Sequence, residues 1–232
     1  MKFFTSAIIA ASGNSTRMGL SVSKQLIKLN GKETISHTLT AFENSDVIDE
    51  IVVVCRECDK EAISAIAQKF SKVKAVVNGS DTRAQSVKNG VLACSENTKF
   101  FAIHDGARPL ISESDIKAVV KHAYVSKAAT LGTPVTDTIK VVDSENIISS
   151  TPDRALLKAV QTPQVFEKSL YLKAIDYAQE NCLNVTDDCS MVEALKEKVS
   201  IVIGSAENIK LTTQTDLIFA QAILNSRENN SK

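Results

Sequence analysis

The chain has 232 residues, of which 44% are hydrophobic and 23% are charged, as in globular proteins and unlike disordered chains. Its 27 basic residues balance its 27 acidic residues, so the net charge does not favour binding to nucleic acid or to an anionic membrane surface. No apolar run approaches the roughly 20 residues that span a bilayer, and the first residues lack the apolar core of a secretory signal. We therefore expect a cytoplasmic protein whose phosphate-binding sites, if any, are local.

Short apolar runs alternate with longer amphipathic stretches along the chain. This alternation predicts an α/β protein of one domain, residues 1–232, with a mainly parallel sheet covered by helices on both faces. The runs that predict strands are Ser6–Ala10, Glu50–Cys55, Lys74–Val77, Lys99–His104, Ala129–Pro134 and Val199–Gly204. The stretches that predict helices are Glu33–Phe42, Asp59–Phe70, Thr82–Ser95, Ser114–Ser126, Glu167–Glu180, Asp188–Lys196 and Gln214–Leu224. Asp59 and Ser112 stand where helix N-caps are expected.

One region departs from this alternation. Two β-rich runs, residues 137–142 and 147–149, flank a polar turn and predict a β-hairpin. Together with the segment that follows, to about residue 162, the hairpin is interpreted as an excursion from the sheet.

The five cysteines are an odd number in a chain too large to need disulfides, so reduced thiols are expected. Cys55 and Cys58 form a C-x-x-C pair. No second pair stands at zinc spacing and no His is close in the sequence, so ordinary thiols after a strand are favoured over a redox or zinc site.

The turn after the first predicted strand is the first candidate site. It reads Ala10-Ala11-Ser12-Gly13-Asn14-Ser15-Thr16-Arg17-Met18-Gly19. Small residues let backbone N–H groups approach a polyphosphate, and Arg17 and Lys24 add the positive charge that a triphosphate requires. Neither the dinucleotide fingerprint nor the P-loop pattern occurs. On these residues alone, a phosphate loop and an ordinary turn both stay open.

Two more polar blocks follow predicted strands, where open α/β sheets bind ligands. In the first, which holds Gly79 and Ser80, Asp81 and Ser86 are candidates for reading a base or a ribose, and a capped helix start is the alternative. The second block reads His104-Asp105-Gly106-Ala107-Arg108-Pro109. Asp105 is well placed to hold Mg²⁺ and Arg108 to bind an anion, with a surface Asp–Arg pair as the alternative. His104 is expected to pack and hydrogen-bond rather than react.

Two last blocks lie near the carboxyl terminus. Asp187 and Asp188, which follow Thr186, are candidates for binding a metal ion, but acidic residues are also electrostatically favourable at the start of a helix. Lys210, in Asn208-Ile209-Lys210-Leu211-Thr212, either neutralises a substrate phosphate or is a solvated lysine at the end of a strand.

Taken in this order, the blocks resemble the 2-C-methyl-D-erythritol 4-phosphate cytidylyltransferase family over about residues 6–222. The parts that carry the resemblance are Arg17-Met18-Gly19 with Lys24-Gln25, Arg83-x-x-Ser86-Val87 with Asn89-Gly90, His104 to Pro109, Asp137-Thr138-Ile139-Lys140, Gln161-Thr162-Pro163-Gln164, Thr186-Asp187-Asp188 and Asn208-Ile209-Lys210. The resemblance implies a Rossmann-like nucleotidyltransferase fold with a β-arm, about residues 137–162, that exchanges contacts in a homodimer. It also implies transfer of CMP from CTP to a polyol phosphate, release of pyrophosphate, and dependence on Mg²⁺ or another divalent cation.

The resemblance further implies roles for individual residues. The catalytic positions are Arg17, Lys24, Arg154 and Lys210. The CTP-binding positions are Ala10, Ala11, Ser12, Gly13, Ser15, Gly79, Ser80, Asp81, Ser86, Asp105 and Ala107. The acceptor-binding positions are Asp105, Arg108, Thr138, Arg154, Thr186 and Lys210, with Thr138 and Arg154 supplied by the partner's arm, and the metal position is Asp105. The chain has Ser15 and Ser23 where the family usually has Gly and Pro.

Three alternatives remain at this stage. A ribitol 5-phosphate cytidylyltransferase shares the fold and most of the CTP loop, but Ala107 and the doubled acid Asp187-Asp188 look more like the methylerythritol enzyme. A Rossmann dehydrogenase lacks support because the dinucleotide fingerprint is missing. A nucleotide sensor without activity is disfavoured by the charges at Arg17, Lys24, Asp105 and Lys210.

Overall fold

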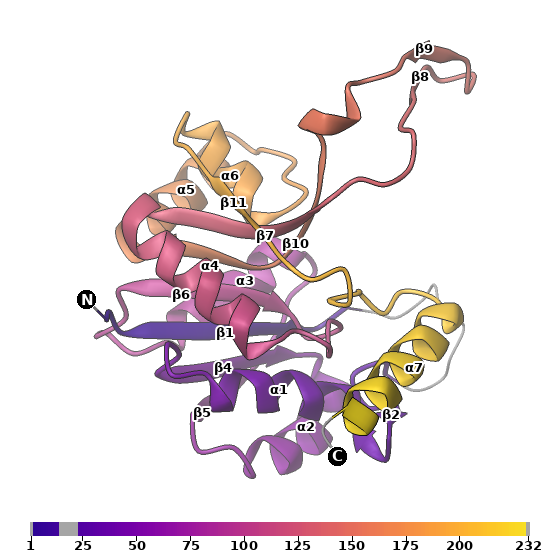
Figure 1. Cartoon of the computed structure of the whole chain (residues 1–232). Coiled ribbons are helices and arrows are strands. Elements are labelled where there is room, and N and C mark those ends of the chain that lie inside the picture. The colour runs from indigo at the N-terminus through magenta and orange to yellow at the C-terminus, as the bar shows by residue number, and fades with distance from the viewer. Residues whose placement is uncertain (1, 14–22, 231–232) are drawn as a thin grey trace.

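A computed structural model describes residues 2–13 and 23–230 of the chain. Seven strands form one sheet in the order β11-β7-β10-β6-β1-β4-β5, with helices on both faces (Figure 1). The strands are β1 (Thr5–Ala11), β4 (Glu50–Cys55), β5 (Val73–Asn78), β6 (Phe100–Asp105), β7 (Ala128–Pro134), β10 (Lys158–Glu167) and β11 (Ser200–Ile203). The helices are α1 (Thr34–Asn44), α2 (Lys60–Ala67), α3 (Arg83–Leu92), α4 (Glu113–Ser126), α5 (Lys168–Glu180), α6 (Asp188–Ala194) and α7 (Gln214–Asn230). The predicted α/β class is confirmed, and each predicted strand and helix is present within three residues of its expected bounds, except that α7 continues past the predicted end at Leu224 to Asn230.

Alternating side chains of the buried strands build two apolar layers. On one face, α1, α2 and α4 pack against residues such as Ile9 and Val53. On the other face, α3, α5 and α6 pack against residues such as Ile8 and Val54. Because successive strand residues point to opposite faces and both faces are covered, these strands are apolar along most of their length, with polar residues at their ends. This explains why the sequence shows continuous apolar runs at β1, β4 and β6.

Strand β10 was not predicted as a strand. It runs antiparallel between β6 and β7, whereas β1, β4, β5 and β6 pair in parallel. It contains Pro163, which has no N–H for a ladder and argues against a central strand. The sheet accommodates Pro163 where the register between β10 and β7 shifts, between Val160 and Gln164.

The predicted hairpin is present and projects from the sheet (Figure 1). Its strands are β8 (Val141–Val142) and β9 (Ile148–Ser150), which pair antiparallel. The Asp143 carboxylate accepts the backbone N–H groups of Glu145 and Ile147, both at 2.9 Å, which closes the turn. The segment from residue 158 already belongs to β10, so the hairpin returns to the sheet earlier than the sequence indicated.

Of the two predicted helix N-caps, one is present and one is not. Ser112 caps α4 as predicted, since its hydroxyl accepts the Asp115 N–H at 3.0 Å. Asp59 precedes α2 but makes no capping bond and instead forms a bidentate pair with Arg56, at 2.7 and 3.1 Å.

A smaller unit lies beside the carboxyl edge of the sheet. The short antiparallel pair β2 (Lys28–Leu29) and β3 (Lys32–Glu33) contacts α7, and Leu29, Leu110 and Leu211 share a minor apolar cluster with that helix. Within the described ranges, no helix is both long and apolar enough to cross a membrane. The C-x-x-C thiols are free: Cys55 is buried at the end of β4 and Cys58 is exposed.

Gly90 offers a test of the packing between α3 and the sheet. A Cβ on Gly90 would lie 2.6 Å from Ile8 Cγ2 and 2.8 Å from Val54 Cγ2, which is too close for a real contact. Gly90→Ala should therefore destabilise the protein by about 1–3 kcal/mol, as overpacking does, although alanine favours an exposed helix by up to about 1 kcal/mol. Urea unfolding measures the difference. Increased stability would contradict the close packing described here.

Candidate active site

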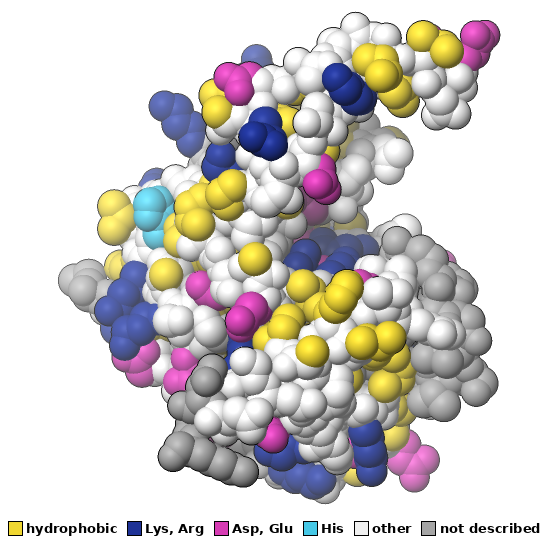
Figure 2. Space-filling view, turned by 45° about the vertical axis from the view of Figure 1, so that its right-hand side comes forward, with side chains coloured by type: hydrophobic (Ala, Val, Ile, Leu, Met, Phe, Trp, Pro, Cys, Tyr) yellow, Lys and Arg dark blue, Asp and Glu magenta, His cyan; other side chains and the backbone are white. Residues whose placement is uncertain are grey.

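The carboxyl ends of four neighbouring strands meet at one edge of the sheet. Strand β1 has β4 on one side and β6 on the other, and such a reversal of strand order creates a crevice at the carboxyl ends. The loops after β1, β4, β5 and β6 line a cavity of about 550 Å³ there. Its lining residues are Ala10, Ser12, Gly13, Lys24, Gln25, Arg56, Gly79, Ser80, Asp81, Thr82, Arg83, Ser86, Asp105, Ala107 and Lys210. In Figure 2, basic side chains gather in a hollow beneath the projecting hairpin.

The Asp105 carboxylate lies among three cationic side chains. Lys210 Nζ is 2.8 Å from Oδ2, Arg83 Nε is 3.6 Å from Oδ1, and Arg108 Nε is 3.8 Å from Oδ2. Burial alone would raise the pKa of Asp105, but the positive charges of Lys210, Arg83 and Arg108 outweigh it and lower the pKa to about 2. Asp105 is therefore an anion at neutral pH.

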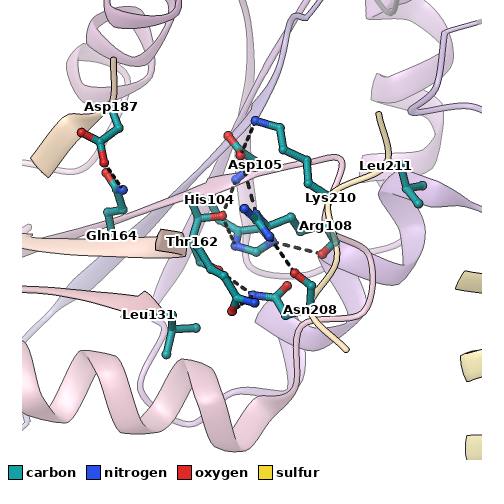
Figure 3. A network of polar contacts seen from close by, with 12 residues as sticks. His104, Asp105, Arg108, Leu131, Thr162, Gln164, Asp187, Asn208, Lys210 and Leu211 are labelled. Carbon is teal, nitrogen blue, oxygen red and sulfur yellow. Dashed lines mark hydrogen bonds and ion pairs between the residues drawn. The ribbon is translucent and has the colours of Figure 1, made fainter. Parts of the chain in front are cut away.

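A layer of buried polar groups holds Asp105 from behind (Figure 3). The Thr162 hydroxyl accepts the Asp105 N–H at 3.1 Å and contacts His104 Nδ1 at 3.0 Å. His104 Nε2 lies 3.2 Å from the Arg108 carbonyl oxygen, which can only accept, so Nε2 carries the proton and Nδ1 accepts from Thr162. With no exposed surface and both nitrogens engaged, His104 packs and hydrogen-bonds, as predicted.

Lys24 and Lys210 are joined by the segment after β11. Lys24 Nζ donates to the Leu211 carbonyl at 3.3 Å, and the Leu211 N–H donates to the Ala107 carbonyl at 2.8 Å. Arg108 donates from its guanidinium to the Asn208 carbonyl at 2.7 Å. These bonds tie together two lysines that line the cavity, of which Lys210 contacts the carboxylate of Asp105.

The other side of the cavity is built from the loop after β5. A Cβ on Gly79 would lie 2.5 Å from the Ser12 Cβ, so only glycine allows the loops after β1 and β5 to approach this closely. The Ser86 hydroxyl accepts the Ser80 N–H at 2.9 Å and donates to the Ser80 carbonyl at 3.2 Å. Thr82 caps α3 by accepting the Gln85 N–H at 3.1 Å. The sequence left open whether this block binds a ligand or only caps a helix. The cap is present, and Asp81 and Ser86 also line the cavity.

The structure brings most of the candidate residues together but not all of them. The candidates that line the cavity are Ala10, Ser12, Gly13, Lys24, Gly79, Ser80, Asp81, Ser86, Asp105, Ala107 and Lys210. Ala11 is buried in the core, and Arg108 contacts Asp105 from behind the lining. Arg154 is on the hairpin side of the sheet, where its guanidinium donates to the Thr136 carbonyl at 2.7 Å, and Thr138 belongs to the same excursion and is exposed. Ser15 and Arg17 fall outside the described residues.

Thr186, Asp187 and Asp188 form a helix start outside the cavity lining. The Asp187 carboxylate accepts the Ser190 N–H at 3.0 Å in a capping box, and it also accepts from the Gln164 amide at 2.8 Å. Asp188 is fully buried and pairs with Arg83 at 2.6 Å. Of the two possibilities left open, the structure therefore supports the helix start.

Four lining residues were not among the predicted site residues: Gln25, Arg56, Thr82 and Arg83. Arg83 and Gln25 stand within the motifs that carry the family resemblance, so the sequence held a signal for both. Arg56 follows β4 directly, and the rule that ligands bind at carboxyl strand ends would have found it. Thr82 has the residue type and spacing of an N-cap.

Comparisons with known proteins agree on one family. The model of the 2-C-methyl-D-erythritol 4-phosphate cytidylyltransferase family matches residues 5–226. A protein of that name from Desulforamulus reducens is 42% identical over 224 residues, which are 95% of this chain and 96% of the relative. One from Caldanaerobacter subterraneus subsp. tengcongensis is 43% identical over 222 residues, 94% and 98% of the two chains. The crystal structure of 4-diphosphocytidyl-2C-methyl-D-erythritol synthase from Anaerococcus prevotii superposes with a TM-score of 0.87 at 33% identity and covers 96% of both chains.

The buried His104 predicts a specific pH dependence of stability. Burial lowers its pKa from an ordinary value of about 6.5 to about 4. Between these two values the unfolded chain binds a proton at this position and the folded chain does not, so stability falls as the pH falls from 6.5 to 4. His104→Gln should remove this part of the dependence, which amounts to at most about 3 kcal/mol.

Urea unfolding of both proteins from pH 7 to pH 4 tests this prediction, with His122→Gln at an exposed position of α4 as the control. The stability advantage of the original chain over His104→Gln should shrink with acidification. An advantage that stays constant across the range would refute the assignment of a neutral buried imidazole.

Proposed function

Because the chain belongs to the 2-C-methyl-D-erythritol 4-phosphate cytidylyltransferase family, we propose that it transfers CMP from CTP to 2-C-methyl-D-erythritol 4-phosphate and releases pyrophosphate. The observation that carries the proposal is one cavity lined by Lys24, by Lys210 paired with Asp105, and by the small residues Ser12 and Gly13. The family match favours methylerythritol phosphate over ribitol phosphate as the acceptor.

In the proposal, CTP lies along the cavity. The loop of Ser12 and Gly13 offers backbone N–H groups to the triphosphate, while Ser80, Asp81 and Ser86, on the other side, bind the base and ribose. Ala10, Ala11, Ser15, Gly79, Asp105 and Ala107 complete the proposed CTP set. Lys24, Lys210 and Arg17 supply the positive charge that the triphosphate requires.

The proposed reaction is an in-line displacement at the α-phosphorus of CTP. An oxygen of the acceptor's phosphate monoester forms the new P–O bond, and the bond to the bridging oxygen of pyrophosphate breaks. The nucleophile is already anionic near neutral pH, so the task of the protein is to position two polyanions and stabilise the charge that develops. Lys24 and Arg17 are proposed to stabilise that charge.

The residues present fit a divalent cation that arrives with the nucleotide. Among the described residues, no three His, Cys, Asp or Glu side chains group into a metal site. Mg²⁺ is commonly bound by one or two carboxylates together with substrate phosphates, and the ionised carboxylate of Asp105 in the cavity suits that mode. When bound, Mg²⁺ would neutralise charge on the phosphate oxygens, with Asp105 as its protein ligand.

The acceptor site is proposed to need two copies of the chain. Asp105, Arg108, Thr186 and Lys210 would come from one subunit, and Thr138 and Arg154 from the arm of the other. The arm carries exposed apolar side chains that a partner would cover: Ile139, Val141, Val142, Ile147, Ile148 and Leu156. A cytoplasmic location remains part of the proposal, on the basis of the odd number of cysteines.

A pyrophosphate-release assay tests the proposed function. Each of the four nucleoside triphosphates is paired with methylerythritol phosphate and with ribitol 5-phosphate, in the presence of Mg²⁺. Turnover should require CTP and the methylerythritol acceptor. Faster turnover with ribitol 5-phosphate, or none with CTP, would reject the assignment.

Lys24→Ala tests the role of the cavity charge in catalysis. Removing a preorganised charge at the reacting phosphate should lower kcat by on the order of 10²-fold or more. Lys28→Ala is the control, because Lys28 is an exposed lysine on β2. Steady-state kinetics with CTP measure the change. An unchanged kcat in Lys24→Ala would count against the role of Lys24.

Arg154→Ala tests the contribution of the arm. It should raise chiefly the KM for the acceptor, because the guanidinium is proposed to bind the acceptor phosphate. If Arg154 acts in the partner's site, mixing the Lys24→Ala and Arg154→Ala proteins at an acceptor concentration far below the raised KM should increase activity above that of either protein alone, since one site of each mixed dimer then holds both native residues. No recovery after subunit exchange, verified by differently tagged chains, would show that the arm serves its own subunit or none.

A further inference from the structure

Arg83 joins two carboxylates that belong to different parts of the fold. Its Nη1 lies 2.6 Å from Asp188 Oδ2, at the start of α6, and its Nε lies 3.6 Å from Asp105 Oδ1, at the end of β6. Arg83 itself is the first residue of α3 and lines the cavity. The planar guanidinium has its donors in a fixed arrangement, so holding one edge with Asp188 sets the direction of the rest of the group.

Asp188 is held rigidly and does not reach the cavity itself. Its side chain has no exposed surface, and its second oxygen accepts from the Tyr171 hydroxyl at 2.6 Å. Its backbone N–H donates to the Gln164 side-chain oxygen at 3.0 Å. Both carboxylate oxygens are therefore engaged, one by a fixed phenol and the other by Arg83.

The charge balance explains why a buried anion is needed there. Burial would lower the pKa of Arg83, but Asp188 first and Asp105 second raise it above its ordinary value, so the side chain is a permanent cation. Without Asp188, the guanidinium would keep Asp105 as its nearby anion and would lose its anchor on α6. It would then be drawn toward Asp105, the carboxylate proposed to serve the nucleotide.

We infer that Asp188 is a positioning residue for nucleotide binding: it anchors Arg83, and through Arg83 it sets the orientation and charge of Asp105 in the cavity. This inference rests on the proposed function for its ligand, CTP with a divalent cation. It assigns a role in binding to a residue that does not touch the cavity. By analogy with partners that orient metal ligands, its loss should weaken binding by on the order of tenfold.

Calorimetric titration of CTP with Mg²⁺ into the full-length protein tests the inference without relying on turnover. Asp188→Asn keeps the shape and an oxygen for Tyr171 but removes the charge that holds Arg83. The expected result is a rise in the Kd for CTP on the order of tenfold. Tyr171→Phe is the matched control: it removes the hydrogen bond to Asp188 and leaves the contact with Arg83, so the Tm should fall while the Kd stays within about twofold.

A second variant separates positioning from folding. Arg83→Lys keeps the charge but lacks the fork that contacts both carboxylates, and it should weaken CTP binding to a similar extent. Combining it with Asp188→Asn should add little, because both changes break the same link. Asp188→Glu, which keeps the charge, should recover part of the affinity.

The outcomes separate this inference from the proposed function. If the original chain does not bind CTP, the proposed function fails. If the original chain binds CTP, and Asp188→Asn lowers the Tm yet binds equally well, the inference is overturned. Fully additive losses in the double variant would overturn it too. If Asp188→Asn does not fold, the Kd of Arg83→Lys for CTP tests the inference instead. An unchanged Kd would refute the positioning role of the Arg83–Asp188 pair.

Discussion

The structure depends on keeping one carboxylate ionised in a buried place. Asp105 has about a tenth of its side chain exposed, yet its pKa is lowered because Lys210 and Arg83, from other parts of the fold, and Arg108, from its own loop, approach it. Those cations would repel one another in a cavity without an anion at its centre. The carboxylate thus lets a chain of zero net charge concentrate positive charge at one point. A polyphosphate that enters meets cations that are already in place, so little reorganisation is required.

Strand β10, which runs antiparallel to both of its neighbours in the sheet, ties this centre to the hairpin. Strand β10 begins at Lys158, where the chain comes back from the arm, and four residues later Thr162 accepts the Asp105 N–H. The same strand supplies Gln164, whose side chain holds the start of α6 and so the anchor of Arg83. Strand β10 therefore connects the arm to the residues behind Asp105 and to the start of α6.

The sequence was sufficient for the features that depend on local pattern. The apolar runs of β1, β4 and β6 and the polar blocks after them predicted both the sheet and the edge at which the candidate residues meet. Strand β10 was missed because Pro163 breaks the pattern, and the sheet tolerates it only through an irregular register with β7. The ion pair of Arg83 with Asp188 spans 105 positions in the sequence, and no spacing rule connects residues so far apart. Contacts of this kind arise where the starts of two helices, here α3 and α6, meet in space, and they become visible only in three dimensions.

The location of Arg154 carries the argument for a second subunit. Its guanidinium donates to a backbone carbonyl of its own arm and is exposed, and the arm projects away from the sheet (Figure 1). Arg154 is not among the residues that line the cavity of its own chain, so binding a phosphate there would require it to leave that position. Exposed apolar side chains on the same arm would gain contacts only when another surface covers them. In the proposed homodimer, a partner chain would meet both requirements at once, because it would cover the apolar side chains and would offer its own cavity to the arginine.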